Sequence, residues 1–175
     1  TYGSLSDWPN ASFPYKHKAA YQELVRAVIA PLAALRANGT QVWVQAENEV
    51  GDAALSSKGK YWRGTTDQYL SQLQALYEAV KSVSPDMPVV LSSFTSEGLD
   101  AVIDPTDGHH EYSSMRITRL LTEGQYDAVD LHFYGCVEDI PAKVAWVKAN
   151  MPTDKLLIST ENGGPDPRCS TTPHS

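Results

Sequence analysis

The sequence predicts a parallel α/β fold, on the strength of two observations. Four short apolar segments alternate along the chain with longer segments in which apolar residues recur every three or four positions. The short segments also lack the polar/apolar alternation of a strand that has one solvent-exposed face. Strands that alternate with helices and are buried on both faces are typical of a parallel sheet covered by helices. This pattern alone does not separate a doubly wound sheet from a barrel.

The first half of the chain is expected to hold two helices and one strand. A turn-rich loop over 1–16 precedes a helix over 17–38, which Pro31 should kink and which Asn38-Gly39 should end. Residues 41–46 form a short β-prone run, predicted to be a strand buried on both faces. A loop over 51–64 follows, and Thr65 or Thr66 is suited to cap the next helix, which ends at about residue 84.

The second half predicts three more strands. They are expected at 88–94, 127–134 and 155–160. A long polar loop over 95–111 leads to a helix near 114–122, and Pro141 is suited to the first turn of a helix that ends at Asn150. Residues 165–175 are expected to be a tail. Because no linker interrupts the sequence, 1–175 is expected to form a single domain.

Composition excludes several classes of function. The 175 residues carry a net charge of −7 and no cluster of Lys and Arg, which argues against a nucleic-acid partner. No segment has the apolar length of a membrane span, and no glycine-rich nucleotide-binding motif follows a strand. The start at Thr1 suggests that something has been removed upstream, and a secreted location is favoured over others. Cys136 and Cys169 are either a disulfide or two inert thiols.

Polar side chains gather where the predicted strands end, which is where parallel α/β folds build active sites. The first strand ends at Glu49, the third carries His132 and Tyr134, and the fourth is followed by Glu161. Hydrolysis of a glycosidic bond needs two carboxyl groups, one to protonate the leaving oxygen and one to attack or to activate water. Glu49 and Glu161 are residues of the required type.

These motifs resemble clan A of the glycoside hydrolases. The resemblance lies in Asn48-Glu49 at one strand end, His132-x-Tyr134 on a later strand and Glu161 followed by Asn-Gly-Gly. The His-x-Tyr motif is similar to family five, the cellulases and mannanases, and family thirty-nine shares the general plan. The resemblance implies a partial (β/α)8 TIM barrel that comprises approximately strands four to seven with their helices.

The resemblance also implies a retaining hydrolase of β-linked oligo- or polysaccharides or glycosides. Glu49 would be the acid/base and Glu161 the nucleophile, with Tyr134 orienting it. Asn48 would donate to the substrate 2-hydroxyl, and His132 would shape the site. Trp62 is a candidate for stacking on a sugar ring. This mechanism requires no cofactor and no metal.

Three alternatives remain open at this stage. Glu47 is a competing acid, because it lies two residues from Glu49 and is expected on the same face. The chain could be a non-catalytic or degenerate carbohydrate-binding barrel. It could also be a metal-dependent barrel enzyme that uses Glu47, Glu49 and Glu161 as ligands. His109-His110 with Asp104 and Asp107 lacks the spacing of a metal motif and is expected to be solvated.

Strands one to three and eight of such a barrel have no counterpart in this sequence. We therefore expect a fragment whose sheet edges need missing barrel segments or self-association to cover them.

Overall fold

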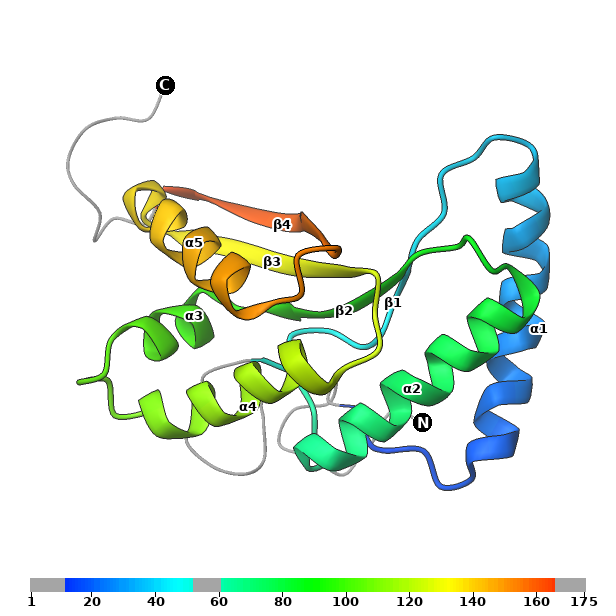
Figure 1. Ribbon diagram of the computed structural model, residues 1–175, viewed down its shortest axis with the longest axis horizontal. Coiled ribbons are helices and arrows are strands. Elements are labelled where there is room, and N and C mark those ends of the chain that lie inside the picture. The colour runs from blue at the N-terminus through cyan, green and yellow to red at the C-terminus, as the bar shows by residue number, and fades with distance from the viewer. Residues whose placement is uncertain (1–11, 52–60, 166–175) are drawn as a thin grey trace.

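A computed structural model of the chain describes residues 12–51 and 61–165. Within these ranges four strands form one sheet in the order β1-β2-β3-β4, and each neighbouring pair is parallel. The strands are β1 (Val44–Gln45), β2 (Val89–Phe94), β3 (Ala128–Gly135) and β4 (Leu156–Pro165). Figure 1 shows them side by side. The predicted parallel α/β fold is confirmed.

The helices run between the strands and pack against one another. They are α1 (Lys18–Ala37), α2 (Thr66–Val83), α3 (Ser96–Ile103), α4 (His110–Glu123) and α5 (Ile140–Asn150), with a short 3-10 turn, η1 (Val137–Asp139), before α5. α1 contacts α2, α2 contacts α4, and α3 contacts both α4 and α5 (Figure 1). Strands in sequence order with helices between them form a curled half-barrel, the partial (β/α)8 architecture that the sequence implies. None of the described helices is long and apolar enough to cross a membrane.

Local signals explain where two of the helices begin. The Thr65 side chain accepts a hydrogen bond from the backbone N–H of Gln68, and the Gln68 side chain accepts one from the Thr65 N–H. This capping box satisfies two N–H groups that α2 would otherwise leave unpaired. Pro141 lies in the first turn of α5, where its missing N–H costs nothing. Both helix starts agree with the sequence prediction.

Other boundaries differ from the prediction. The expected long loop over 95–111 is wrong, because it contains α3, whose cap is the Thr95 hydroxyl accepting from the Gly98 N–H. α4 begins at His110 rather than near residue 114, and β4 continues to Pro165 rather than ending at residue 160. α1 runs through Pro31 as one continuous helix.

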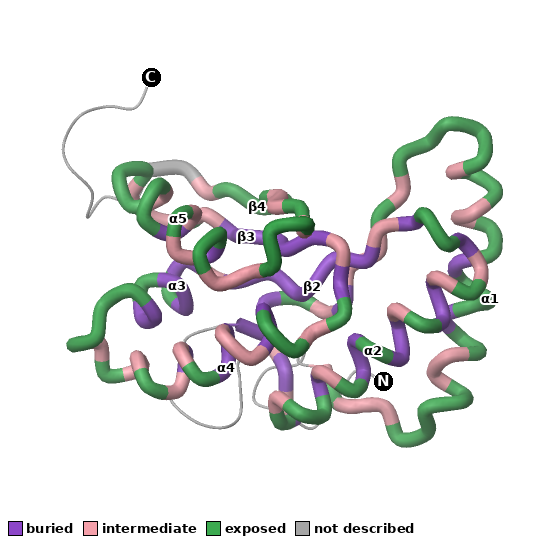
Figure 2. Tube along the Cα trace, in the orientation of Figure 1, coloured by how far each residue is buried: buried purple, intermediate pink, exposed green. Residues whose placement is uncertain are grey.

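Burial varies from one strand to the next, as Figure 2 shows. Every residue of β2 is buried, because β1 and β3 flank it and helices cover it. β1 is only two residues long and half-buried, which contradicts the expected six-residue strand buried on both faces. Trp43, directly before β1, is 38% exposed and therefore lies outside the core.

One face of α1 is apolar and exposed, with Leu24, Val28 and Leu35 each about half or more accessible to solvent. These residues lie on a helix that packs against α2. The expected association with missing barrel segments or with a second copy stays a prediction.

Most of the predicted tail, residues 166–175, lies outside the described residues, and Cys169 is among them. Cys136 is disulfide-bonded.

Candidate active site

The turn after β1 presents the Glu49 side chain. Glu47 and Glu49 both have a positive φ, +64° and +47°, which is uncommon for residues other than glycine. The turn is held by β2, because the Glu49 N–H donates to the Ser93 hydroxyl at 2.9 Å and the Val50 N–H donates to the Ser92 hydroxyl at 2.8 Å. Backbone strain of this kind persists where the surroundings enforce it, and it is concentrated at functional sites.

The Tyr69 hydroxyl fixes the approach of β1 to β2. It donates to the Ala46 carbonyl at 2.8 Å and accepts from the Ser92 N–H at 3.0 Å. Burial raises the pKa of Tyr69 far above its ordinary value, so the phenol keeps its proton. The two hydrogen bonds of Tyr69 therefore hold the chain after β1 against β2, because Ala46 follows the last residue of β1.

β3 places three polar side chains on one face, because residues two apart in a strand point the same way. They are Asp130, His132 and Tyr134. The His132 ring is almost completely buried, with 1% of its side chain exposed. Its Nδ1 lies 2.9 Å from Oε1 of Glu49 and 3.5 Å from Oε2 of Glu161, and its Nε2 lies 3.2 Å from Oδ2 of Asp130.

A β-bulge in β4 brings Glu161 to the same face. Asp130 pairs with Ile158, but His132 pairs with Glu161, so β4 contains one residue more than β3 in this interval. A regular ladder would place Thr160 opposite His132. The bulge instead sets Glu161 level with the imidazole, which is how bulges re-aim side chains beside active sites.

Tyr134 contacts the second carboxylate directly. Its hydroxyl donates to Oε2 of Glu161 at 2.9 Å, and this hydrogen bond with the negative charge of Glu161 raises the pKa of the Tyr134 phenol. The Tyr134 ring lies against Gly163, where an added Cβ would clash with the ring atoms. Gly163 therefore leaves the room that the ring needs.

The buried charges of the site are mutually compensated. Burial alone would lower the pKa of His132, but hydrogen bonds to Asp130 and Glu49 and the charges of Asp130 and Glu161 outweigh it and raise the pKa to about 9. Burial alone would raise the pKa of Asp130, but hydrogen bonds from His132 and Thr160 lower it below its ordinary value. The two directions agree, so His132 is an imidazolium at neutral pH with a proton on each ring nitrogen.

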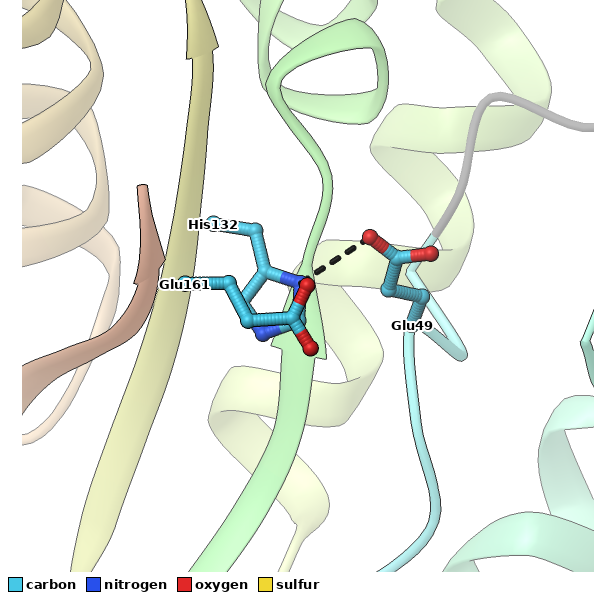
Figure 3. A group of neighbouring side chains, drawn as sticks. All are labelled: Glu49, His132 and Glu161. Carbon is cyan, nitrogen blue, oxygen red and sulfur yellow. Dashed lines mark hydrogen bonds and ion pairs between the residues drawn. The ribbon is translucent and has the colours of Figure 1, made fainter. Parts of the chain in front are cut away.

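Glu49, His132 and Glu161 form a compact group (Figure 3). One oxygen of each carboxylate and one ring nitrogen of His132 all lie within 4.8 Å of one another. Among the described residues these three have the geometry to surround a cation. A metal would have to displace the Nδ1 proton of His132, because an imidazole binds metals through an unprotonated nitrogen.

The remaining candidates lie apart from this group. The side chain of Glu47, the competing acid and a ligand in the metal alternative, accepts a 2.6 Å hydrogen bond from Gln72 of α2 and lies outside the group of Glu49, His132 and Glu161. Asn48 is exposed at the strand end, where its Oδ1 accepts from the Ser93 hydroxyl at 3.3 Å. His109 contacts Asp107 and His110 contacts the Ala101 carbonyl, and both histidines are half-buried rather than fully solvated as expected.

The expectation that Trp62 stacks on a sugar ring is wrong. Its side chain is fully buried, packs edge-on against Tyr69 and donates through Nε1 to the Thr65 carbonyl. A ring without exposed surface has no face to offer to a sugar. Trp62 is a core residue instead and is not part of the proposed site.

Sequence reasoning missed Asp130 and Thr160. A signal was present, because Asp130 is an acidic residue inside an otherwise apolar strand and lies two positions before His132. A buried acidic residue needs partners, and strand alternation places it on the face of His132. Thr160 carried no such signal, because its role depends on the bulge.

The sequence matches no family model and no curated protein. Solved structures do resemble the fold. The catalytic domain of a GH53 protein from Ignisphaera aggregans aligns with a TM-score of 0.54 at 21% identity, over 84% of this chain and 38% of that one. A glucosidase from Croceicoccus marinus aligns with a TM-score of 0.58 at 17% identity, over 95% and 35% of the two chains.

Fungal β-1,4-galactanases give a TM-score of 0.54 at 16% identity, over 94% of this chain and 49% of theirs. The chain thus spans between a third and a half of the length of these neighbours. At this level of identity the likeness concerns the fold alone, and it agrees with a partial (β/α)8 TIM barrel.

Proposed function

We propose that this chain carries the catalytic residues of a retaining glycoside hydrolase that acts on β-linked oligo- or polysaccharides or glycosides. Glu161 is the nucleophile and Glu49 is the acid/base in this proposal. The observation that carries it is the short separation of the two carboxylates, one oxygen of each lying within 4.8 Å of the other. Retaining enzymes hold these groups about 5–5.5 Å apart, whereas inverting enzymes leave about 6.5–9.5 Å for a water molecule.

The surroundings of the two carboxylates support different roles. The side chain of Glu161 is 46% exposed and receives the Tyr134 hydrogen bond, so it is accessible to an anomeric carbon and oriented toward it. The side chain of Glu49 is only 11% exposed, and Nδ1 of His132 holds its Oε1, so in this proposal the other oxygen, Oε2, carries the proton that is transferred. These features suit an accessible nucleophile and a fixed proton donor.

The proposed reaction proceeds in two displacements. Glu161 attacks the anomeric carbon and forms an ester bond, while Glu49 gives its proton to the departing glycosidic oxygen. Glu49, now ionised, takes a proton from water, which breaks the ester and releases the sugar with its original configuration. Asn48 is exposed at the same strand end, where its amide can donate to the sugar 2-hydroxyl.

Trapping of the covalent intermediate tests this proposal. The chain is incubated with activated 2-deoxy-2-fluoro aryl β-glycosides of the gluco, galacto and manno series, and the intact mass and peptide masses are measured. We expect one sugar per chain, attached to Glu161. Because trapping needs a single turnover, it suits a chain that spans only part of its neighbours' length.

Matched variants separate the alternatives. Glu161→Gln should abolish the adduct, and Glu49→Gln should slow its formation most for sugars with poor leaving groups. Glu47→Gln is the control, since its side chain is bound to Gln72 and lies outside the group. Loss of the adduct with chelator would favour a metal-dependent enzyme, and sugar binding without an adduct would favour a non-catalytic barrel.

A further inference from the structure

Asp130 is a fully buried carboxylate that the proposed reaction does not use. It has no exposed surface and lies in the middle of β3. Burial of a charge is costly unless polar partners compensate it, and Asp130 has three such contacts within the described structure. One is the ion pair with Nε2 of His132 at 3.2 Å, and two are hydrogen bonds from Thr160 of the neighbouring strand.

The contacts with Thr160 hold the β4 bulge in place. The Thr160 N–H donates to Oδ1 of Asp130 at 2.9 Å, and the Thr160 hydroxyl donates to Oδ2 at 2.6 Å. Thr160 belongs to the interval in which β4 has its additional residue, and Glu161 follows it directly. A bulge leaves a backbone group without a ladder partner, and Asp130 supplies the acceptor from its side chain.

The contact between Asp130 and His132 fixes the orientation of the imidazole ring and so determines which ring nitrogen faces the two glutamates. Oδ2 of Asp130 accepts from Nε2, so the opposite nitrogen, Nδ1, faces Glu49 and Glu161 with its own proton. A carboxylate partner at Nε2 orients the ring and stabilises the imidazolium. Both effects act on the two proposed catalytic glutamates through an intermediate residue.

We propose that Asp130 is a positioning residue, which sets Glu161 by holding the bulge at Thr160 and directs the Nδ1 proton of His132 toward both glutamates. This inference rests on the proposed function for its catalytic meaning. Its structural part is that the Asp130 carboxylate holds the β4 bulge and orients the His132 ring, and this part depends only on the contacts described above.

Ring nitrogen NMR of the full chain tests the structural content. With 15N-labelled histidine at pH 7, both nitrogens of His132 should give signals of protonated nitrogen. In Asp130→Asn an amide replaces one acceptor oxygen, so Nε2 should lose its proton and move to the range of unprotonated nitrogen. Asp127→Asn is the matched control: Asp127 precedes β3 directly, pairs with Lys81 and the Val89 N–H, and should leave His132 unchanged.

Trapping with the fluoro-sugar tests the catalytic content. Replacement of an orienting Asp by Asn costs about 10⁴-fold in a serine protease, and we expect a loss of about 100-fold or more in adduct formation for Asp130→Asn. Asp127→Asn should stay within about twofold of the unmodified chain. Equal ring signals in the two variants would overturn the proposal, because a residue that only stabilises the fold would not change the imidazole.

If Asp130→Asn does not fold, the unmodified chain still tests the proposal. A neutral His132 ring with an unprotonated Nε2 in that chain would overturn it without any variant. Failure of the proposed function looks different, since the unmodified chain would then form no adduct while its His132 signals still showed both protons.

Discussion

The hydroxyl of Tyr134 and the carboxylate of Glu161 are joined by a 2.9 Å hydrogen bond between β3 and β4. The phenol donates to the oxygen that would carry the negative charge of a nucleophile. Charge-assisted hydrogen bonds of this kind are stronger than neutral ones and fix the acceptor in one orientation.

Tyr134→Phe should slow adduct formation by about 10- to 100-fold, because a hydrogen bond to a charged group contributes about 1.5–3 kcal/mol. The melting temperature should change little, since the Tyr134 side chain is about half exposed. Rates of fluoro-sugar trapping measure the effect. Tyr15→Phe is the control, because its hydroxyl contacts Ser71, on α2. An unchanged rate for Tyr134→Phe would remove Tyr134 from the proposed site.

Gly163→Ala should reduce trapping to the level of Tyr134→Phe. The new methyl group would overlap the Tyr134 ring and push its hydroxyl away from Glu161. Gly108→Ala provides a matched control, because no atom lies within 4 Å of the position of an added Cβ there. The double variant Gly163→Ala/Tyr134→Phe should be no slower than either single variant, which tests that both act on one contact.

Stability should fall as the pH rises toward alkaline values. The folded protein raises the pKa of His132 to about 9, above the value of about 6.5 expected in an unfolded chain. The resulting stabilisation is fully present below pH ~6.5 and is lost as the pH rises through about 9. It should amount to about 1–3 kcal/mol, measured by urea unfolding at several pH values. His132→Gln should flatten this part of the curve, and a curve that stays steep would assign the effect to another group.

Thr65→Ala should lower the free energy of unfolding by about 1 kcal/mol, because it removes the side-chain cap of α2. Denaturant unfolding monitored by circular dichroism measures the loss. His17 occupies the equivalent position before α1 but makes no side-chain cap hydrogen bond, so His17→Ala should change stability by much less. An equal loss in both variants would contradict the capping account.

Much of the fold could be predicted from the sequence, because its strands are apolar runs with clear boundaries. β2 and β3 match their predicted ranges to within one residue at either end, and α5 begins next to Pro141 as expected. The failures have physical causes. β1 is short because the chain leaves the sheet for the strained turn at Glu47 and Glu49, and no sequence rule indicates a left-handed glutamate.

The site was predictable in its residue types and less so in its geometry. Strand alternation places His132 and Tyr134 on one face, but the same rule would put Glu47 beside Glu49. The left-handed backbone at both glutamates breaks that periodicity and sends Glu47 toward Gln72. Likewise, the bulge that aligns Glu161 with His132 is a feature of two paired strands, so one strand's sequence cannot reveal it.

The simple order of the sheet also bears on how the site comes into being. Each strand pairs only with the strand before or after it in the chain, so the sheet can grow in chain order, whereas the contact of Glu49 with His132 joins residues 83 positions apart and has to wait for β3. Parallel strand pairs close long loops and therefore form slowly, and domains emerge from synthesis N-terminal part first. The loop of Glu49 can therefore dock on β2 early, while the carboxylate of Glu161 completes the cluster only when β4 joins, as the last event of assembly among the described strands.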